Sequence, residues 1–165
     1  MNPSFTHIDE KGQAIMVDVS QKQDTVRTAA ASGRISMSRE CYDAVVHGDV
    51  AKGDVLGTAR IGGIMAVKQT SQLIPLCHVL NITKCGIDFT FHEEDHEIEA
   101  ICTVRCTGQT GVEMEALTGA SIALLTIYDM CKAIDRTMCI GAVHVLEKRG
   151  GKSGDFFYDE KDRTT

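Results

Sequence analysis

Apolar and polar positions alternate along two neighbouring stretches in the second half of the chain. In residues 80–91, Ile87 and Phe89 alternate with Asp88 and Thr90, and residues 97–107 keep the same period from Ile98 onward. A period of two places successive side chains on opposite faces of a strand. The two stretches therefore predict a β-hairpin with one buried face, joined by an acidic turn at residues 92–96.

Two longer stretches have the composition of helices that pack closely. Residues 112–134 are apolar on almost every side, which is typical of a buried helix, and they include the small residues Gly119 and Ala120. Residues 54–70 predict a second helix that contains three glycines. Because each glycine costs a helix about 1 kcal/mol relative to alanine, we expect another backbone to lie very close to this second helix. These glycines are Gly57, Gly62 and Gly63.

Weaker signals complete the set of elements. Ser38 is a typical N-cap for a helix through about His47, and Gly48 ends that helix. Residues 138–147 predict a last strand, and residues 13–19 and 25–37 contain short extended segments. The order of strands, helices, hairpin, helix and strand predicts an α+β fold in which helices cover one face of an antiparallel sheet.

Length and composition indicate a single globular domain. The 165 residues contain no repeat and no linker, so we expect one domain over residues 1–165, with flexible ends at about 1–12 and 156–165. No apolar run reaches the roughly 18 residues of a membrane span, and the first residues do not form a signal peptide. The seven cysteines include no CxxC and fall mostly in apolar patterns. We therefore expect buried free thiols in a reducing cytoplasm.

The formal net charge of −6 disfavours a nucleic-acid binder, which needs a basic surface. The excess of acidic residues lies in one segment of the chain. Residues 88–99 hold six acidic residues and no Lys or Arg, and outside them acidic and basic residues are equal at 17 each. The net charge therefore does not argue against an anionic small molecule such as a nucleotide.

Two motif matches are rejected because of their contexts. Residues 92–96 match HExxH, whose zinc chemistry needs both histidines on one face of a helix, but they lie in the predicted hairpin turn. A metallohydrolase built on His92 and His96 is thus a weak alternative. Residues 151–153 match the end of a phosphate-binding P-loop, but Leu146 replaces its first glycine and no helix is expected to follow.

The Leu76-Cys77-His78 segment follows Pro75 at the junction of a predicted helix and a predicted strand. Site residues tend to lie at such junctions. The structural alternative for His78 is a half-buried histidine whose hydrogen bonds are satisfied within the fold.

Four charged residues interrupt the apolar helix at residues 112–134. Asp129 and Lys132 are three apart and close enough to pair, and Asp129 falls on the same helix face as Glu115. Since buried charges are costly unless they are paired or used, Glu113, Glu115, Asp129 and Lys132 favour an acid/base site with perturbed pKa values. An ion pair that holds the helix to the sheet is the alternative.

Several lysines are candidates for binding an anion. Lys52 precedes the helix at residues 54–70, whose N-terminus favours anions, and Lys68 lies on that helix. On their own both are ordinary surface lysines. The glycine-rich loop after residue 147 carries Lys148, Arg149 and Lys152, and it can bind an anion through backbone N–H groups and charged side chains.

Several motifs occur together in the order of a known family. They cover residues 6–8, 16–20, 52–55, 59–61, 73–78, 107–117, 128–133 and 150–155. On these motifs the chain closely resembles the molybdenum cofactor biosynthesis protein C family, the cyclic pyranopterin monophosphate synthases, over roughly residues 5–157. One difference is Val79, where the family usually has a proline that would fix φ.

The resemblance implies a ferredoxin-like α+β fold and a lyase of molybdenum cofactor (molybdopterin) biosynthesis that follows a radical SAM enzyme. Such an enzyme converts 3′,8-cyclo-7,8-dihydro-GTP into cyclic pyranopterin monophosphate and releases pyrophosphate. The family forms a hexamer, a trimer of dimers, with the site at a subunit interface. We expect no cofactor and no metal ion.

By motif, the resemblance implies that Asp129, Lys132 and Lys52 are catalytic. We expect the remaining site residues to bind the substrate: Leu76, Cys77, His78, Glu113, Met114, Glu115, Lys68, Lys148 and Lys152. We further expect Lys52, Lys132, Lys148, Arg149 and Lys152 to converge on the triphosphate. The alternative function is a non-catalytic nucleotide-binding scaffold subunit of the same pathway.

Overall fold

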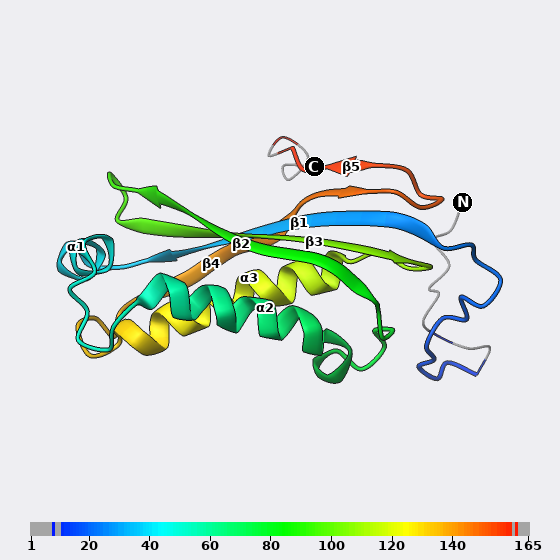
Figure 1. Ribbon diagram of the computed structural model, residues 1–165, viewed down its shortest axis with the longest axis horizontal. Coiled ribbons are helices and arrows are strands. Elements are labelled where there is room, and N and C mark those ends of the chain that lie inside the picture. The colour runs from blue at the N-terminus through cyan, green and yellow to red at the C-terminus, as the bar shows by residue number, and fades with distance from the viewer. Residues whose placement is uncertain (1–7, 9–10, 160, 162–165) are drawn as a thin grey trace.

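A computed structural model describes residues 8, 11–159 and 161 of the chain. It contains a five-stranded antiparallel sheet in the order β2-β3-β1-β4-β5, with α2 and α3 on one face of the sheet (Figure 1). The elements are β1 (Thr25–Ser36), α1 (Arg39–His47), α2 (Val55–Leu73), β2 (Ile82–His92), β3 (Glu97–Gly108), α3 (Glu113–Cys131), β4 (Cys139–Arg149) and β5 (Phe156–Phe157).

The connectivity confirms the predicted fold class. If α1 and α2 are counted as one connection, the order of β1, helix, β2, β3, helix and β4 is that of a ferredoxin-like fold. Within the described residues, no helix has both the length and the apolar character needed to cross a bilayer.

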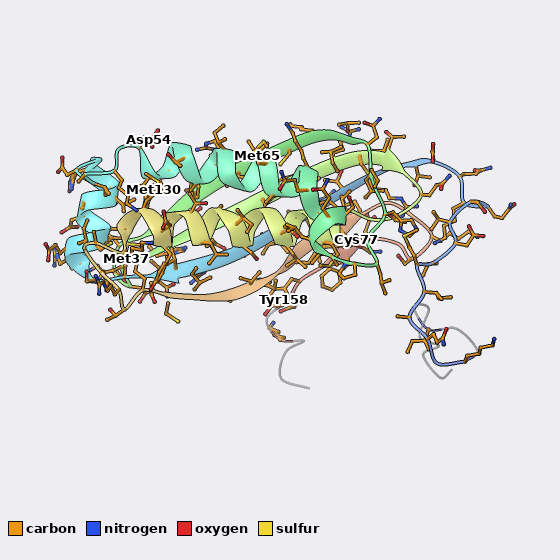
Figure 2. The ribbon with its side chains drawn as sticks, turned by 90° about the horizontal axis from the view of Figure 1, so that it is seen from below. Met37, Asp54, Met65, Cys77, Met130 and Tyr158 are labelled. Atoms are coloured by element: carbon orange, nitrogen blue, oxygen red, sulfur yellow. The ribbon has the colours of Figure 1, made fainter. Side chains whose placement is uncertain are left out.

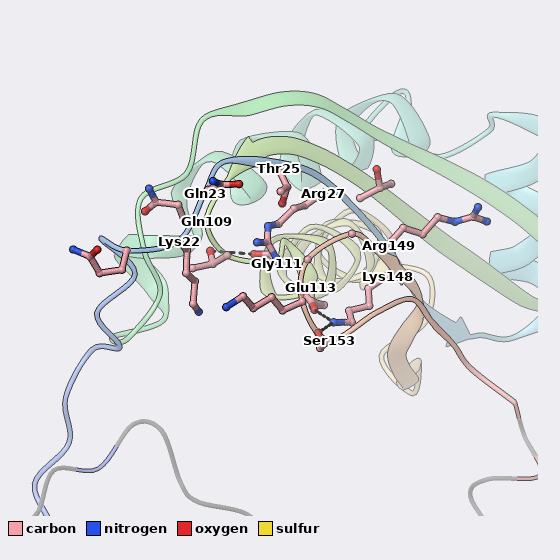
Figure 3. A pocket seen from close by; sticks show the side chains of 16 residues that line it. Lys22, Gln23, Thr25, Arg27, Gln109, Gly111, Glu113, Lys148, Arg149 and Ser153 are labelled. Atoms are coloured by element: carbon pink, nitrogen blue, oxygen red, sulfur yellow. Dashed lines mark hydrogen bonds and ion pairs between the residues drawn. The ribbon is translucent and has the colours of Figure 1, made fainter.

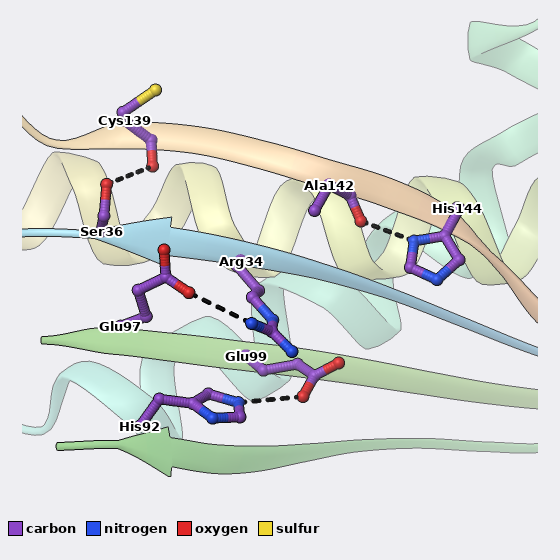
Figure 4. A network of polar contacts seen from close by, with 8 residues as sticks. All are labelled: Arg34, Ser36, His92, Glu97, Glu99, Cys139, Ala142 and His144. Atoms are coloured by element: carbon purple, nitrogen blue, oxygen red, sulfur yellow. Dashed lines mark hydrogen bonds and ion pairs between the residues drawn. The ribbon is translucent and has the colours of Figure 1, made fainter. Parts of the chain in front are cut away.

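The predicted hairpin is confirmed, with β2 and β3 paired from Ile82 to His92. The acidic HExxH segment forms the turn between them, so its two histidines do not lie on a helix. His92 Nε2 lies 3.2 Å from the Glu99 carboxylate on β3 (Figure 4), whereas His96 packs against the Tyr42 ring.

Helix α1 begins and ends as predicted. The Ser38 hydroxyl accepts a hydrogen bond from the Cys41 N–H, and Gly48 ends the helix with a φ of 77°. Such a left-handed φ suits glycine because it lacks a Cβ. Asp54 is the N-cap of α2, and its carboxylate accepts a hydrogen bond from the Gly57 N–H.

The predicted close approach to α2 occurs where α2 crosses α3. A Cβ on Gly63 would lie 2.8 Å from the Gly119 carbonyl oxygen, and one on Gly119 would lie 3.4 Å from the Gly63 carbonyl oxygen. The contact therefore lies within one chain. A Cβ on Gly62 would instead meet the Thr126 hydroxyl, and one on Gly57 the Asp54 carboxylate.

Other segments differ from the prediction. Residues 25–36 form one long strand, β1, whereas in residues 13–19 the structure has only an isolated bridge from Ala14 to Ile8. Helix α3 ends at Cys131, three residues earlier than predicted. Strand β5 pairs with β4 inside the segment expected to be a flexible end. The rest of the expected flexible ends lies partly outside the described residues, at 1–7, 9, 10, 160 and 162–165.

The cysteines are all free thiols, as expected. Cys41, Cys102, Cys106 and Cys131 are buried, and Cys77 and Cys85 are half-buried. Cys139 is exposed at the start of β4, so the expectation of a buried thiol is wrong there.

Candidate active site

All three predicted catalytic residues meet at the C-terminal end of α3. Lys132 Nζ donates a hydrogen bond of 2.7 Å to Asp129 Oδ1. Lys52, from the loop between α1 and α2, donates a hydrogen bond of 2.7 Å to the Asp129 carbonyl oxygen and lies 3.5 Å from Asp129 Oδ2. A cation suits this position because the last carbonyl groups of a helix carry its negative dipole end. We call Asp129, Lys132 and Lys52 the lysine–aspartate cluster.

The lysine–aspartate cluster lies on the surface of the chain. The side chains of Asp129, Lys132 and Lys52 are 61, 52 and 45% exposed. The expectation of buried charges is therefore wrong for Asp129 and Lys132, because the helix projects them away from the packed core. The hydrogen bond from Lys132 is the main reason that the pKa of Asp129 is lowered, and Lys52 adds to it. Asp129 is thus a carboxylate at neutral pH.

The expectation of a buried acid is confirmed at the opposite end of α3. Glu115 lies in the first turn of α3 and is 4% exposed. Burial raises its pKa, and the neighbouring charge of Glu113 raises it further. The Glu113 carboxylate folds back over Gly111, where a Cβ would lie 1.9 Å from Glu113 Oε2.

Helix α3 separates these two groups. Asp129 and Glu115 are fourteen residues apart, and a rise of 1.5 Å per residue places them about 21 Å apart along the axis. Figure 2 shows Met130 and Asp54 toward one end of the molecule and Cys77 toward the other. The predicted convergence of Lys52 and Lys132 with Lys148, Arg149 and Lys152 is therefore wrong within one chain.

A cavity of about 320 Å³ near the start of α3 is lined by six of the nine predicted substrate-binding residues: Leu76, Cys77, His78, Glu113, Met114 and Glu115. We call it the acidic cavity, because Glu113 and Glu115 both line it. His78 Nε2 lies 2.8 Å from the Val17 carbonyl oxygen; since a carbonyl only accepts, Nε2 carries the hydrogen. Burial and the nearby Glu115 raise the pKa of the Cys77 thiol. The lining also includes Leu80, Val17, Val19, Lys22, Thr110 and Gly111.

A larger cavity of about 790 Å³ adjoins the acidic cavity, and the two share Lys22, Thr110, Gly111 and Glu113. We call it the basic cavity (Figure 3). Its basic residues are Lys22, Arg27, Lys148, Arg149 and Lys152, and Glu113 is the acidic residue among its lining.

Hydrogen bonds hold two of these basic groups in place. Lys148 Nζ donates to the Ser153 hydroxyl and lies 3.9 Å from Glu113 Oε1 (Figure 3). Arg27 Nε donates to the Gly108 carbonyl oxygen at 3.0 Å. Arg149 is different, because its guanidinium pairs with Glu147 and lies over the Phe157 ring.

The predicted glycine loop forms one wall of the basic cavity. Gly150 and Gly151 have φ values of 89° and 86°. A Cβ on Gly151 would lie 2.2 Å from the Arg27 guanidinium, so glycine lets the loop lie directly on this arginine. The turn after Gly151 leads to β5 rather than to a helix. A P-loop is followed by a helix, so this agrees with the rejection of that motif.

Sequence reasoning missed Arg27 and Lys22. Arg27 stands in a stretch interpreted only as extended backbone, and Lys22 precedes it in a polar segment. The family motif at residues 107–117 could have pointed to this region, because its Gln109, Thr110 and Gly111 line the same basic cavity. Lys68, predicted to bind substrate, lines neither cavity and lies near Cys85, whose pKa it helps to lower.

Among the residues that the structure describes, no three His, Cys, Asp or Glu side chains are grouped to hold a metal ion. The side chains that line the two cavities include carboxyl, ammonium, guanidinium and imidazole groups. Such groups can bind a polyphosphate and transfer protons.

Comparison with known proteins gives a consistent result. The sequence profile described as the MoaC family matches residues 16–151. A protein of Clostridium botulinum named cyclic pyranopterin monophosphate synthase is 56% identical over 156 residues, which are 94% of this chain and 98% of that protein. A protein of the same name from Heliobacterium modesticaldum is 54% identical over 160 residues, 97% of this chain and 100% of that protein.

The match with the profile includes both ends of α3 and the walls of the acidic cavity. The identity to both relatives is above one half over at least 94% of this chain. The chain belongs to the MoaC family.

Proposed function

We propose that this chain is a cyclic pyranopterin monophosphate synthase of molybdenum cofactor biosynthesis. It converts 3′,8-cyclo-7,8-dihydro-GTP into cyclic pyranopterin monophosphate and releases pyrophosphate. The observation that carries this proposal is the pair of adjoining cavities, one basic and one acidic, that share Glu113. A triphosphate joined to a guanine-derived ring needs these two environments side by side.

The basic cavity binds the triphosphate in this proposal. Arg27, Lys148 and Lys152 come from β1, β4 and the glycine loop and supply cationic donors. Charge-assisted hydrogen bonds to phosphate are among the stronger ones in proteins. The same donors stabilise the negative charge that develops on pyrophosphate as it leaves.

The acidic cavity binds the guanine-derived ring. Carboxylates match the N–H groups of such a ring, and Glu113 and Glu115 are close to each other at the start of α3. Burial keeps Glu115 protonated to a higher pH than an ordinary glutamate. Glu115 can therefore donate a proton or a hydrogen bond where Glu113 accepts one.

The lysine–aspartate cluster performs the proton transfers. Lys132 and Lys52 both donate to Asp129, so the carboxylate orients two ammonium groups that can donate protons to the substrate as general acids. Because the cluster lies about 21 Å along α3 from Glu115, a second subunit has to bring it to the cavities. We therefore propose a site between subunits of a homo-oligomer, a hexamer built as a trimer of dimers.

The exposure of the lysine–aspartate cluster supports the proposed subunit contact, since charged groups that act in catalysis usually work in a site from which water is excluded. We further propose that the protein acts in the cytoplasm, which agrees with its seven free thiols. Light scattering of the purified protein measures the oligomer directly.

The decisive experiment is mass spectrometry of the product made by purified protein from 3′,8-cyclo-7,8-dihydro-GTP. We expect cyclic pyranopterin monophosphate and one pyrophosphate per substrate. A protein that binds this intermediate but releases no pyrophosphate would instead be the non-catalytic scaffold subunit.

A further inference from the structure

The turn after α3 contains a buried carboxylate that the proposed chemistry does not use. Asp135 is 7% exposed. Its Oδ1 accepts hydrogen bonds of 2.7 Å from the backbone N–H and the hydroxyl of Thr137, and its Oδ2 accepts one of 2.7 Å from the Ser38 backbone N–H. The Thr137 hydroxyl is the main cause of a lowered pKa at Asp135, so the group is ionised at neutral pH.

Asp135 connects two elements that are far apart in the sequence. Ser38 is the N-cap of α1, so the carboxylate also lies at the positive end of the α1 dipole. Asp135 follows Lys132 by three residues, and its own N–H donates to the Cys131 carbonyl oxygen at 3.2 Å. One side chain therefore ties the start of α1 to the turn that ends α3.

Helix α1 in turn determines where Lys52 lies. The chain runs from Gly48 to Lys52 through a short loop held by two backbone hydrogen bonds, Asp49 N–H to Ala44 and Gly53 N–H to Val50. Val50 is 6% exposed and packs in the core. A shift of α1 would therefore move Lys52 with it.

A second contact joins the same two helices. Cys41 on α1 and Cys131 on α3 are both fully buried in the same core, and each thiol affects the pKa of the other. Burial of these thiols is an apolar contribution to the contact between the helices, whereas Asp135 supplies a polar link from the start of α1 to the turn after α3. Lys52 Nζ lies 3.5 Å from Asp129 Oδ2, near the outer limit of a hydrogen bond. A small shift is therefore enough to separate the ammonium from the carboxylate, even if the 2.7 Å bond to the Asp129 carbonyl oxygen persists.

We infer that Asp135 is a positioning residue that holds Lys52 beside Asp129 through its bond to the start of α1. The inference rests on the proposed function, because it assigns a role within the lysine–aspartate cluster. Asp135 lines neither cavity, so substrate binding there does not depend on it.

The substitution Asp135→Asn tests this in the full-length protein. Asparagine keeps an oxygen for Thr137 but turns an N–H donor toward the Ser38 N–H, so it breaks the link to α1 selectively. We expect kcat to fall between about tenfold and a hundredfold, with KM unchanged. We also expect the acidic limb of the kcat–pH profile to move to higher pH, because Asp129 loses the stabilising charge of Lys52 while Lys132 stays in place.

Two further variants help to interpret this experiment. Thr137→Val removes one of the three bonds to Asp135 and should lower kcat by less, which provides a test if Asp135→Asn does not fold. Asp43→Asn, on the exposed side of α1 beside Arg39, serves as a matched control and should leave kcat unchanged.

Two results would overturn the inference. An unchanged kcat in both Asp135→Asn and Thr137→Val, with Asp129→Asn inactive, would reject the role of Asp135 and keep the proposed function. Near-normal turnover in Asp129→Asn would reject the proposed role of the lysine–aspartate cluster, and the role of Asp135 with it.

Discussion

The two ends of α3 carry charged groups in opposite surroundings. At the C-terminal end, Asp129 and its two lysines are at least 45% exposed and paired with one another. At the N-terminal end, Glu115 is 4% exposed, and the partly buried Glu113 lies between two cavities. In the proposed function, the N-terminal end binds the substrate, and its cavities are lined by residues of one chain. The C-terminal end has the groups that we propose for proton transfer but is exposed, which is why the proposal adds the surface of a second subunit.

The largest expected effect comes from the exposed end. Asp129→Asn and Lys132→Ala should each lower kcat by about 10²–10⁴, the usual contribution of a general acid or base. The KM should change little, because the cavities lie at the other end of α3. Measurement of pyrophosphate release over a range of substrate concentrations separates the two parameters. Glu94→Gln, in the exposed hairpin turn, is the matched control, and equal losses in that variant would contradict the assignment.

A different effect is expected at the enclosed end. Lys148→Met keeps the length of the side chain but removes the ammonium group that faces Glu113 and Ser153. Loss of one hydrogen bond to a charged group, about 1.5–3 kcal/mol, should raise KM between about tenfold and a hundredfold. The dependence of KM on ionic strength should also weaken. If only kcat fell, the assignment of substrate binding to the N-terminal end of α3 and of proton transfer to the C-terminal end would be wrong.

The middle of α3 sets the distance between the two ends, and its packing is testable. Gly63→Ala places a Cβ 2.8 Å from the Gly119 carbonyl oxygen and 2.9 Å from Ile87 Cδ1. Overpacking of this kind lowers the free energy of unfolding by about 1–3 kcal/mol, against a gain in helix propensity of about 1 kcal/mol. We expect a net loss in urea denaturation. Gly86→Ala, where a Cβ meets nothing within 4 Å, is the control; a loss as large in that variant would contradict the packing argument.

The smallest expected effect is a difference in pH dependence. The raised pKa of Glu115 means that its contribution to stability is fully present below pH 4.5, its usual pKa, and is lost as the pH rises through the folded-state pKa. Glu115→Gln should therefore gain in Tm relative to the natural chain as the pH rises from 4 to 8.

The contribution of Asp135 to stability depends on pH in the opposite direction. Its lowered pKa gives stability above pH 3.8, which is lost as the pH falls through the folded-state pKa. The Tm of Asp135→Asn should therefore approach that of the natural chain below pH 4. If the Tm of Glu115→Gln differed from that of the natural chain by the same amount at every pH, the statement on Glu115 would be contradicted. The same result for Asp135→Asn would contradict the statement on Asp135.

Local patterns predicted most of the elements and the pairing of Asp129 with Lys132. Both depend on neighbours along the chain: alternation for the hairpin, an N-cap at Ser38, and a spacing of three on a helix. The sequence could not predict that Glu115 is buried while Asp129 is exposed, because both residues lie on the same face of one apolar helix. Their difference depends on where the sheet and loops cover that face. Arg27 lies against the glycine loop that forms one wall of the basic cavity, although Gly150 is 123 positions later in the sequence.

The central claim is that the lysine–aspartate cluster of one chain serves the cavities of another. Mixing two impaired variants tests it: Asp129→Asn, and a chain with both Arg27→Met and Lys148→Met. The two proteins are unfolded together, refolded, and assayed for pyrophosphate release at low substrate concentration. If chains combine at random, about a quarter of the sites regain both intact parts, so activity should rise well above that of either variant alone. Mixed oligomers that form but stay as inactive as their parents would contradict the claim.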